Sequence, residues 1–257
     1  MREEDSRGMD LVRPPAVAGR FYPLEAGRLR QEVEGLLQRA HASPDPRARG
    51  LLSPHAGYVY SGKVAAEGFK VLSAWRGRAR RILLLGPSHF VPFLGAAFYP
   101  YRAWATPLGE VVVDLEGGSR LVAKGPPFLA YEEPFREEHS LEVLLPFLQV
   151  ALPDTPILPL LFGETDPKEV AEALLSELGE GDLVVASSDL SHYHPDPVAR
   201  NRDQKTLERA LALDVEGVAQ GEACGRLPWA TLTALAGNLG WKPRLLAYAT
   251  SAEAFGE

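Results

Sequence analysis

Three short apolar runs in this chain each stop at small residues or proline and then reach a histidine. They are Leu51-Leu52-Ser53-Pro54-His55, Ile82-Leu83-Leu84-Leu85-Gly86-Pro87-Ser88-His89 and Leu183-Val184-Val185-Ala186-Ser187-Ser188-Asp189-Leu190-Ser191-His192. Such runs are typical of buried strands in a parallel sheet, and ligands bind in the crevice beyond the carboxyl ends of those strands. The sequence therefore predicts these histidines, together with His194, at one edge of a sheet.

The rest of the chain alternates between strand and helix patterns. Short apolar runs predict strands at 51–52, 82–85, 95–98, 110–113, 157–162, 183–186 and 244–250. Apolar residues at helical spacing predict helices at 24–41, 61–75, 115–123, 138–151, 166–178, 197–213 and 228–239. This alternation predicts an α/β sandwich with a mostly parallel central sheet flanked by helices. We expect a single domain over residues 13–257, preceded by a polar arm at residues 1–12.

Composition narrows the classes of partner. The formal net charge is −7, and no apolar run reaches membrane-spanning length. Since broad nucleic-acid binding needs clustered Lys and Arg, we expect no nucleic-acid and no membrane partner. The basic cluster Arg76, Arg78, Arg80 and Arg81 is interpreted as a solvated connection between a helix and a strand, with a nucleic-acid patch as the alternative. The acidic amino terminus opens no secretory signal, so the cytoplasm is the expected location.

Several side chains in these segments can carry chemistry. Imidazole binds transition metals and exchanges protons near neutral pH, although a histidine at a strand end can also be purely structural. Asp189 supplies a carboxylate or caps the following turn. Cys224, the single cysteine, stands before a predicted helix and close to Arg226. Both features lower the pKa of a thiol and favour the thiolate that binds metals or attacks electrophiles; an inert buried thiol is the alternative.

Two further segments add aromatic and basic groups. Tyr58 and Tyr60 follow the first histidine among glycines, and tyrosine can stack or donate a hydrogen bond. His139 stands at the start of a predicted helix, where it either faces the same crevice or serves packing.

Six ordered segments that cover most of the chain resemble the Memo family. They are Arg13-Pro14-Pro15-Ala16-Val17-Ala18-Gly19-Arg20-Phe21-Tyr22-Pro23, Pro54-His55-Ala56-Gly57-Tyr58, Gly86-Pro87-Ser88-His89, Glu138-His139-Ser140-Leu141-Glu142, Ser187-Ser188-Asp189-Leu190-Ser191-His192 and Cys224-Gly225-Arg226. The resemblance implies a fold like that of the class III extradiol dioxygenases of the LigB type. It also implies a metal pocket made by two histidines and a cysteine.

The resemblance assigns that pocket residue by residue. His55, His89 and Cys224 would be the metal ligands. Asp189 and His192 would line the pocket, and a substrate would lie near Tyr58, Tyr60 and His139. The related dioxygenases have a carboxylate in place of the cysteine. Because a soft thiolate shifts metal preference toward copper or zinc, ring-opening activity cannot be carried over from the fold.

The sequence thus predicts a metal-binding redox protein, an oxidoreductase with an unknown small substrate. Iron or copper is the expected metal, with zinc as the alternative. Asp189 would orient a ligand or a bound water, and His192 would act as acid or base.

Two other functions stay open at this point. One is a binding module for a peptide or another ligand without turnover, because the animal relatives are associated with phosphotyrosine peptides. The other is metal-dependent hydrolysis, in which the metal activates a water molecule. The resemblance also implies a functional link to a radical-SAM protein.

Overall fold

The computed structural model describes residues 11–255 and contains a central sheet with the strand order β2-β9-β3-β8-β4-β7. Its strands are β2 (Gly50–Ser53), β3 (Arg81–Pro87), β4 (Ala96–Phe98), β7 (Phe128–Ala130), β8 (Ile157–Phe162) and β9 (Asp182–Ser187). The first four strands of that order run parallel, β4 is antiparallel to β8, and β7 is parallel to β4. The predicted α/β fold with a mostly parallel sheet is confirmed.

The three central strands are apolar because both faces of the sheet are covered. Every residue of β3, β8 and β9 is buried. In the register of the sheet, Leu84 of β3 lies between Val185 of β9 and Pro159 of β8. Continuous apolar runs, rather than alternating ones, are what burial on both faces requires.

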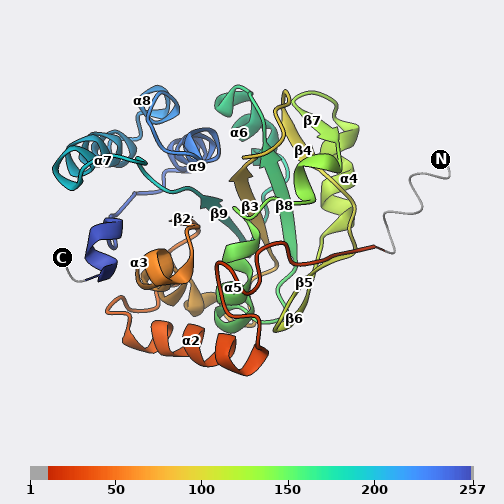
Figure 1. Cartoon of the computed structure of the whole chain (residues 1–257). Coiled ribbons are helices and arrows are strands. Elements are labelled where there is room, and N and C mark those ends of the chain that lie inside the picture. Colours follow the sequence, from red (N-terminus) through yellow and green to blue (C-terminus); the bar gives the residue numbers. More distant parts are fainter. Residues whose placement is uncertain (1–10, 256–257) are drawn as a thin grey trace.

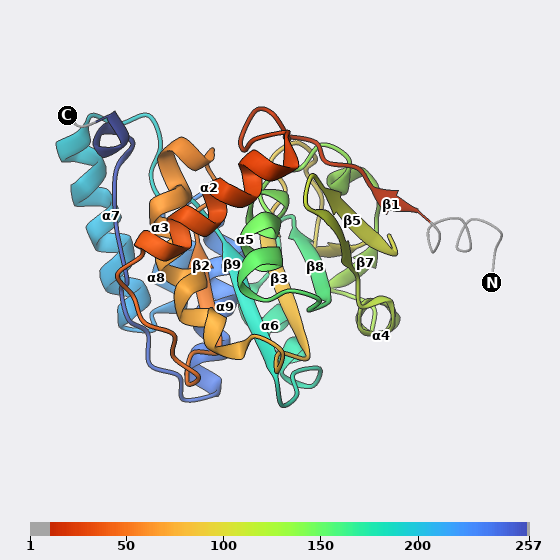
Figure 2. The same ribbon diagram turned by 90° about the horizontal axis from the view of Figure 1, so that it is seen from below.

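Helices form a layer on each side of this sheet (Figures 1 and 2). On one side lie α2 (Ala26–Arg39), α3 (Tyr58–Leu72) and α5 (Leu145–Ala151). On the other lie α6 (Pro167–Leu175), α8 (Val215–Ala219) and α9 (Arg226–Asn238), with α9 packed against β2, β3 and β9. The remaining helices are α4 (Leu115–Ala123) beside β7, and α7 (Asp196–Leu211) against α8. None of the described helices has both the length and the hydropathy that crossing a bilayer requires.

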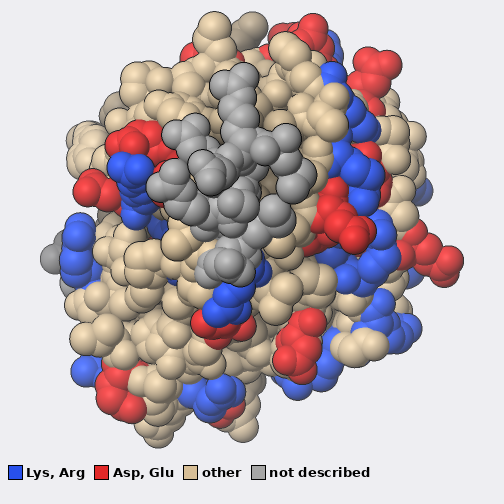
Figure 3. Space-filling view, turned by 90° about the vertical axis from the view of Figure 1, so that its right-hand side faces the viewer, with Lys and Arg blue, Asp and Glu red and all other residues tan. Residues whose placement is uncertain are grey.

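A smaller sheet joins the amino-terminal segment to the body. Strand β1 (Val12–Arg13) is parallel to β5 (Ala103–Thr106), which is antiparallel to β6 (Gly109–Val112). The face that Figure 3 shows carries interspersed acidic and basic side chains, with no broad area of one sign. The predicted polar arm falls outside the described residues except for its last two, of which Val12 begins β1.

Two predicted elements differ from the structure. The strand expected at 244–250 is wrong: this segment pairs with no strand, and its side chains bind α7 instead, through Tyr248 to Asp203 and Thr250 to Asp196. The helix expected at 138–151 is shorter, because only a 3₁₀ turn (Glu142–Leu144) and α5 are helical. Strands β5 and β7 and helix α8 were not expected from the sequence.

The predicted basic cluster lies at the amino end of β3. Arg81 is buried and forms ion pairs with Asp114 and Asp182, and Arg80 also pairs with Asp182. Arg76 and Arg78 are exposed and donate to backbone carbonyls. This end of the sheet therefore holds an ion-pair network in which two arginines are balanced by two carboxylates.

Candidate metal centre

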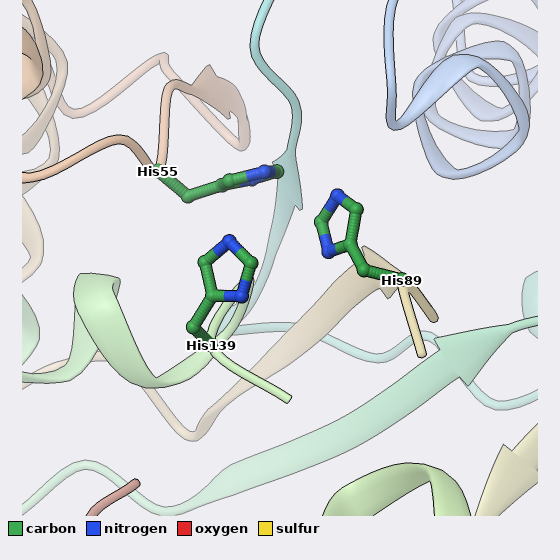
Figure 4. Close-up of side chains that lie close together, drawn as sticks. All are labelled: His55, His89 and His139. Atoms are coloured by element: carbon green, nitrogen blue, oxygen red, sulfur yellow. The ribbon is translucent and has the colours of Figure 1, made fainter. Parts of the chain in front are cut away.

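Three imidazole rings meet at the carboxyl end of the central sheet. His55 follows β2, His89 follows β3, and His139 lies in the segment before α5. Figure 4 shows the three rings turned toward one another from these separate segments. One nitrogen from each ring can be chosen so that all three lie within 4.8 Å of one another, which makes this a group that could hold a metal ion.

The hydrogen bonds of His55 fix which nitrogen faces the cluster. Its Nδ1 lies 2.7 Å from the hydroxyl of Ser187, and that hydroxyl lies 2.6 Å from the carbonyl of Ser140. Since a carbonyl can only accept, the Ser187 hydroxyl donates to Ser140 and accepts from Nδ1–H of His55. Nε2 of His55 is therefore the nitrogen left to bind a metal, and the residue is only 1% exposed.

His89 is oriented by a buried carboxylate. Its Nδ1 lies 2.8 Å from Oε1 of Glu138, which is 1% exposed. Glu138 also accepts hydrogen bonds from the backbone N–H groups of His89, His139 and Ser140. Burial raises the pKa of this carboxyl, but the hydrogen bonds and the positive charge of His89 outweigh it and hold the pKa at about 2. The carboxylate is therefore charged, and Nε2 of His89 faces the cluster, as in carboxylate–histidine–metal arrangements.

His139 is the neutral ring of the three. It stacks on His89 with ring centroids 4.7 Å apart, and Phe21 covers it at 4.8 Å. Burial, together with the neighbouring His55 and His89, lowers the pKa of His139 to about 4 despite the nearby Glu138. Near pH 7 this imidazole therefore has a lone pair that can accept a proton or bind a metal.

Cys224 brings a sulfur to the same place from the start of α9. Its Sγ lies 3.3 Å from Nε2 of His55. Burial raises the pKa of the thiol, but the imidazoles of His55 and His89 lower it to about 6. Burial also opposes charge on His89, yet Cys224 and Glu138 raise its pKa to about 10. The metal-free centre therefore pairs a thiolate with imidazolium, and a metal would displace those protons.

Asp189 braces the turn that carries His55. Its Oδ1 accepts hydrogen bonds from the backbone N–H groups of His55, at 2.8 Å, and Ala56, at 3.3 Å. Its own N–H donates to Sγ of Cys224 at 3.3 Å, and its carbonyl accepts from the Cys224 N–H. One residue thus ties the imidazole and the sulfur together.

The other predicted site residues lie farther out. His192 is on the exposed loop after β9, with its ring against Tyr193, and no hydrogen bond or ring contact within residues 11–255 joins it to the three-histidine group. Tyr58 is in the core, where its hydroxyl donates to the carbonyl of Val143. Tyr60 is 43% exposed on the first turn of α3. Among the predicted pocket residues, His139 is part of the cluster and Asp189 contacts it through His55 and Cys224.

Sequence reasoning missed two supporting residues, Glu138 and Ser187. Glu138 directly precedes His139, so a carboxylate beside a candidate ligand was the available signal. Ser187 is the last residue of β9, where a hydroxyl on a buried apolar run is itself unusual.

The donor set fits a transition metal. Ligands bound at about 2.0 to 2.3 Å in a tetrahedral arrangement lie about 3.3 to 3.8 Å from one another. The separation of 3.3 Å between Sγ of Cys224 and Nε2 of His55 falls in that range, and the chosen nitrogens of the three histidines lie within 4.8 Å of one another.

Comparisons with known proteins place this chain among relatives of one family. The family model described as Memo-like protein matches residues 13–257. A MEMO1 family protein of Methanopyrus kandleri is 35% identical, covering 96% of this chain and 95% of the relative. One from Methanosarcina barkeri is 36% identical, with coverage of 96% and 95%. A crystal structure of an uncharacterized protein from Escherichia coli K12 matches with a TM-score of 0.42 at 18% identity, covering 65% of this chain and 80% of that one.

Proposed function

This chain belongs to the Memo family, and on that premise we propose that it is an oxidoreductase that binds one redox-active metal, iron or copper, through His55, His89 and Cys224. Its substrate would be a small molecule that enters at the carboxyl edge of the sheet. The likeness to class III extradiol dioxygenases belongs to this proposal as well.

The observation that carries the proposal is the way the donors are held. His55 and His89 each have Nδ1 fixed by a hydrogen bond, so that Nε2 of each is left to bind a metal, and Nε2 of His55 lies 3.3 Å from the sulfur of Cys224. A hydrogen bond to the nitrogen that does not bind the metal orients a histidine ligand and raises its basicity. A purely structural histidine needs no such arrangement with two other donors.

The mixed nitrogen and sulfur set suits copper as well as zinc, and the redox role rests on a redox-active ion occupying it. When bound, an iron or copper ion would supply a site that exchanges electrons with substrate and dioxygen. We assign proton transfer to His139, whose neutral ring is part of the cluster and within reach of a bound molecule. His192 is the second candidate for this role. It ranks behind His139 because it lies on an exposed loop and would have to approach the cluster.

Metal content tests the proposal directly. Protein purified without added metal, and protein reloaded with copper, iron or zinc after chelation, should hold about one ion per chain. A double variant, Cys224→Ala with His89→Ala, should lose it. His41→Ala is the matched control, because His41 is exposed on the segment after α2 and should change nothing. Equal metal in the wild type and the double variant would refute the ligand assignment.

Two further outcomes separate the alternatives. His139→Ala should keep its metal if His139 transfers protons, whereas loss of the metal would make it a ligand. Protein that retains zinc alone under every loading condition, with no redox change under dioxygen, would overturn the oxidoreductase and favour metal-assisted hydrolysis.

A further inference from the structure

The segment from Arg13 to Tyr22 is fastened to the body by one buried carboxylate. Glu142 is 0% exposed and accepts hydrogen bonds from the backbone N–H groups of Ala16 and Val17 and from the hydroxyl of Tyr22. It also pairs with Arg13 at 2.7 Å. Four donors from one stretch of chain thus converge on a single buried side chain, which fixes the position of this segment on the body of the protein.

Arg13 extends this connection toward the metal centre. Besides Glu142, its guanidinium donates through Nε to the carbonyl of Phe135 at 2.6 Å and through Nη2 to the carbonyl of Glu138 at 2.5 Å. Its flat face lies 4.3 Å from the ring of Trp104. The side chain is 1% exposed, so the planar fork holds three acceptors in one fixed geometry.

The hydrogen bond from Arg13 to the backbone carbonyl of Glu138 connects the amino-terminal segment to the metal centre. The side chain of Glu138 holds Nδ1 of His89, and its carboxylate also receives the N–H of His139. Phe21, at the far end of the same amino-terminal segment, packs on the ring of His139. The segment therefore reaches the centre twice, once through the backbone of Glu138 and once through an aromatic ring.

We propose that Arg13 is a positioning residue for the centre: it fixes the backbone of Glu138, and through the carboxylate of Glu138 it sets the orientation of His89 and His139. The amino-terminal segment is then part of the metal site rather than a cover over the core. This inference rests on the proposed function, because it assigns a role within the same site.

The test compares two buried arginines: Arg13, in β1 of the smaller sheet, and Arg81, at the amino end of β3 in the central sheet. Arg13→Lys keeps the charge but cannot span the three acceptors. Arg81→Lys is the matched control, because Arg81 is 2% exposed and is also held by carboxylates and a carbonyl, but at the amino edge. Copper affinity, the Cu(II) electron paramagnetic resonance spectrum and the melting temperature of the metal-free protein are measured for both.

Both variants should melt at lower temperature than the wild type, whereas only Arg13→Lys should bind copper about 10-fold more weakly and show an altered spectrum. Glu142→Gln, which keeps the volume of the side chain, should also weaken copper binding and alter the spectrum. It replaces Arg13→Lys in the test if that variant does not fold. Equal affinities and spectra for Arg13→Lys and Arg81→Lys would reduce Arg13 to a purely structural residue and overturn the proposal.

A measurement without metal separates this inference from the proposed function. Nitrogen-15 spectra of the histidine rings report whether Nδ1 of His89 keeps its hydrogen bond. Arg13→Lys should shift the His89 signals and Arg81→Lys should not. If the wild type binds no metal but Arg13→Lys still shifts the His89 signals, the proposed function is refuted and the positioning role is kept. Unshifted His89 signals in Arg13→Lys would refute that role.

Discussion

The buried polar groups at the two ends of the central sheet are arranged in opposite ways. At the amino end, Arg81 meets Asp182 and Asp114, so each buried charge faces its opposite. At the carboxyl end, the outer nitrogens of His55 and His89 face one another and the sulfur of Cys224. Placing several lone-pair atoms, such as imidazole nitrogens and a sulfur, side by side destabilises the folded protein unless a cation or shared protons lie between them. The amino end is therefore organised for stability, and the carboxyl end for binding.

The largest expected effect is on stability at the amino end. Asp182→Asn removes the carboxylate that Arg80 and Arg81 share, and Asp182 is only 2% exposed. Breaking a buried ion pair leaves an uncompensated charge, so we expect a loss of about 3 kcal/mol in the free energy of unfolding. Urea titration of the metal-free protein measures it, and copper affinity should stay at the wild-type value. If Asp182→Asn also loses copper binding, the claim that the two ends serve separate roles is wrong.

The next effect is on binding at the carboxyl end. Glu138→Gln keeps the shape of the side chain but removes the charge that fixes His89, so metal affinity should fall about 10- to 100-fold. Glu137→Gln is the control, because this neighbouring glutamate is exposed. Competition with a chromophoric chelator gives both affinities, and the same value for the two variants would exclude a role for Glu138.

A smaller change is expected at the partner of His55. Ser187→Ala leaves Nδ1–H of His55 without its acceptor, at a cost of about 1 kcal/mol to the orientation of the ring. Metal binding should weaken by about fivefold, since 1.4 kcal/mol corresponds to tenfold. Ser73→Ala removes another hydroxyl that donates to a carbonyl, at the far end of α3, and should leave the affinity unaltered. Isothermal titration resolves the difference.

The smallest effect is a dependence on pH at the amino end. Burial works against the charge on Asp114, but the Gly117 N–H and Arg81 outweigh it and lower the pKa of this carboxyl below its usual 3.8. A carboxyl whose pKa is depressed by folding stabilises the protein above its unfolded pKa, and this contribution is lost as pH falls through the folded pKa. The stability difference between the wild type and Asp114→Asn should therefore be constant above about pH 5 and shrink below pH 4. A difference that grows in acid would contradict the ion-pair account.

The sequence was most informative where a local pattern decides the structure. The runs at 82–85, 157–162 and 183–186 form strands whose residues are all buried, and a strand covered on both faces requires such a continuous apolar run. The segment at 244–250 mixes apolar, aromatic and polar side chains, none of them buried, and a strand also needs a partner. Tyr248 and Thr250 find theirs on α7, which is a distant contact that no local pattern encodes.

Distant contacts also limited what could be predicted about the site. The convergence of His55 and His89 follows from the rule that parallel strands end at one edge, so it could be predicted. The parts played by Glu138 and Ser187 depend on which hydroxyl or carboxylate lies within 3 Å of a ring nitrogen. That distance is set by the packing of three separate segments, including the one that Arg13 holds.

X-ray absorption spectroscopy of the copper-loaded protein tests the central claim most directly. We predict nitrogen ligands from two or three imidazoles at about 2.0 Å and one sulfur ligand at about 2.3 Å, with the sulfur lost in Cys224→Ala. A shell of oxygen and nitrogen alone, unchanged by that substitution, would contradict the proposed centre.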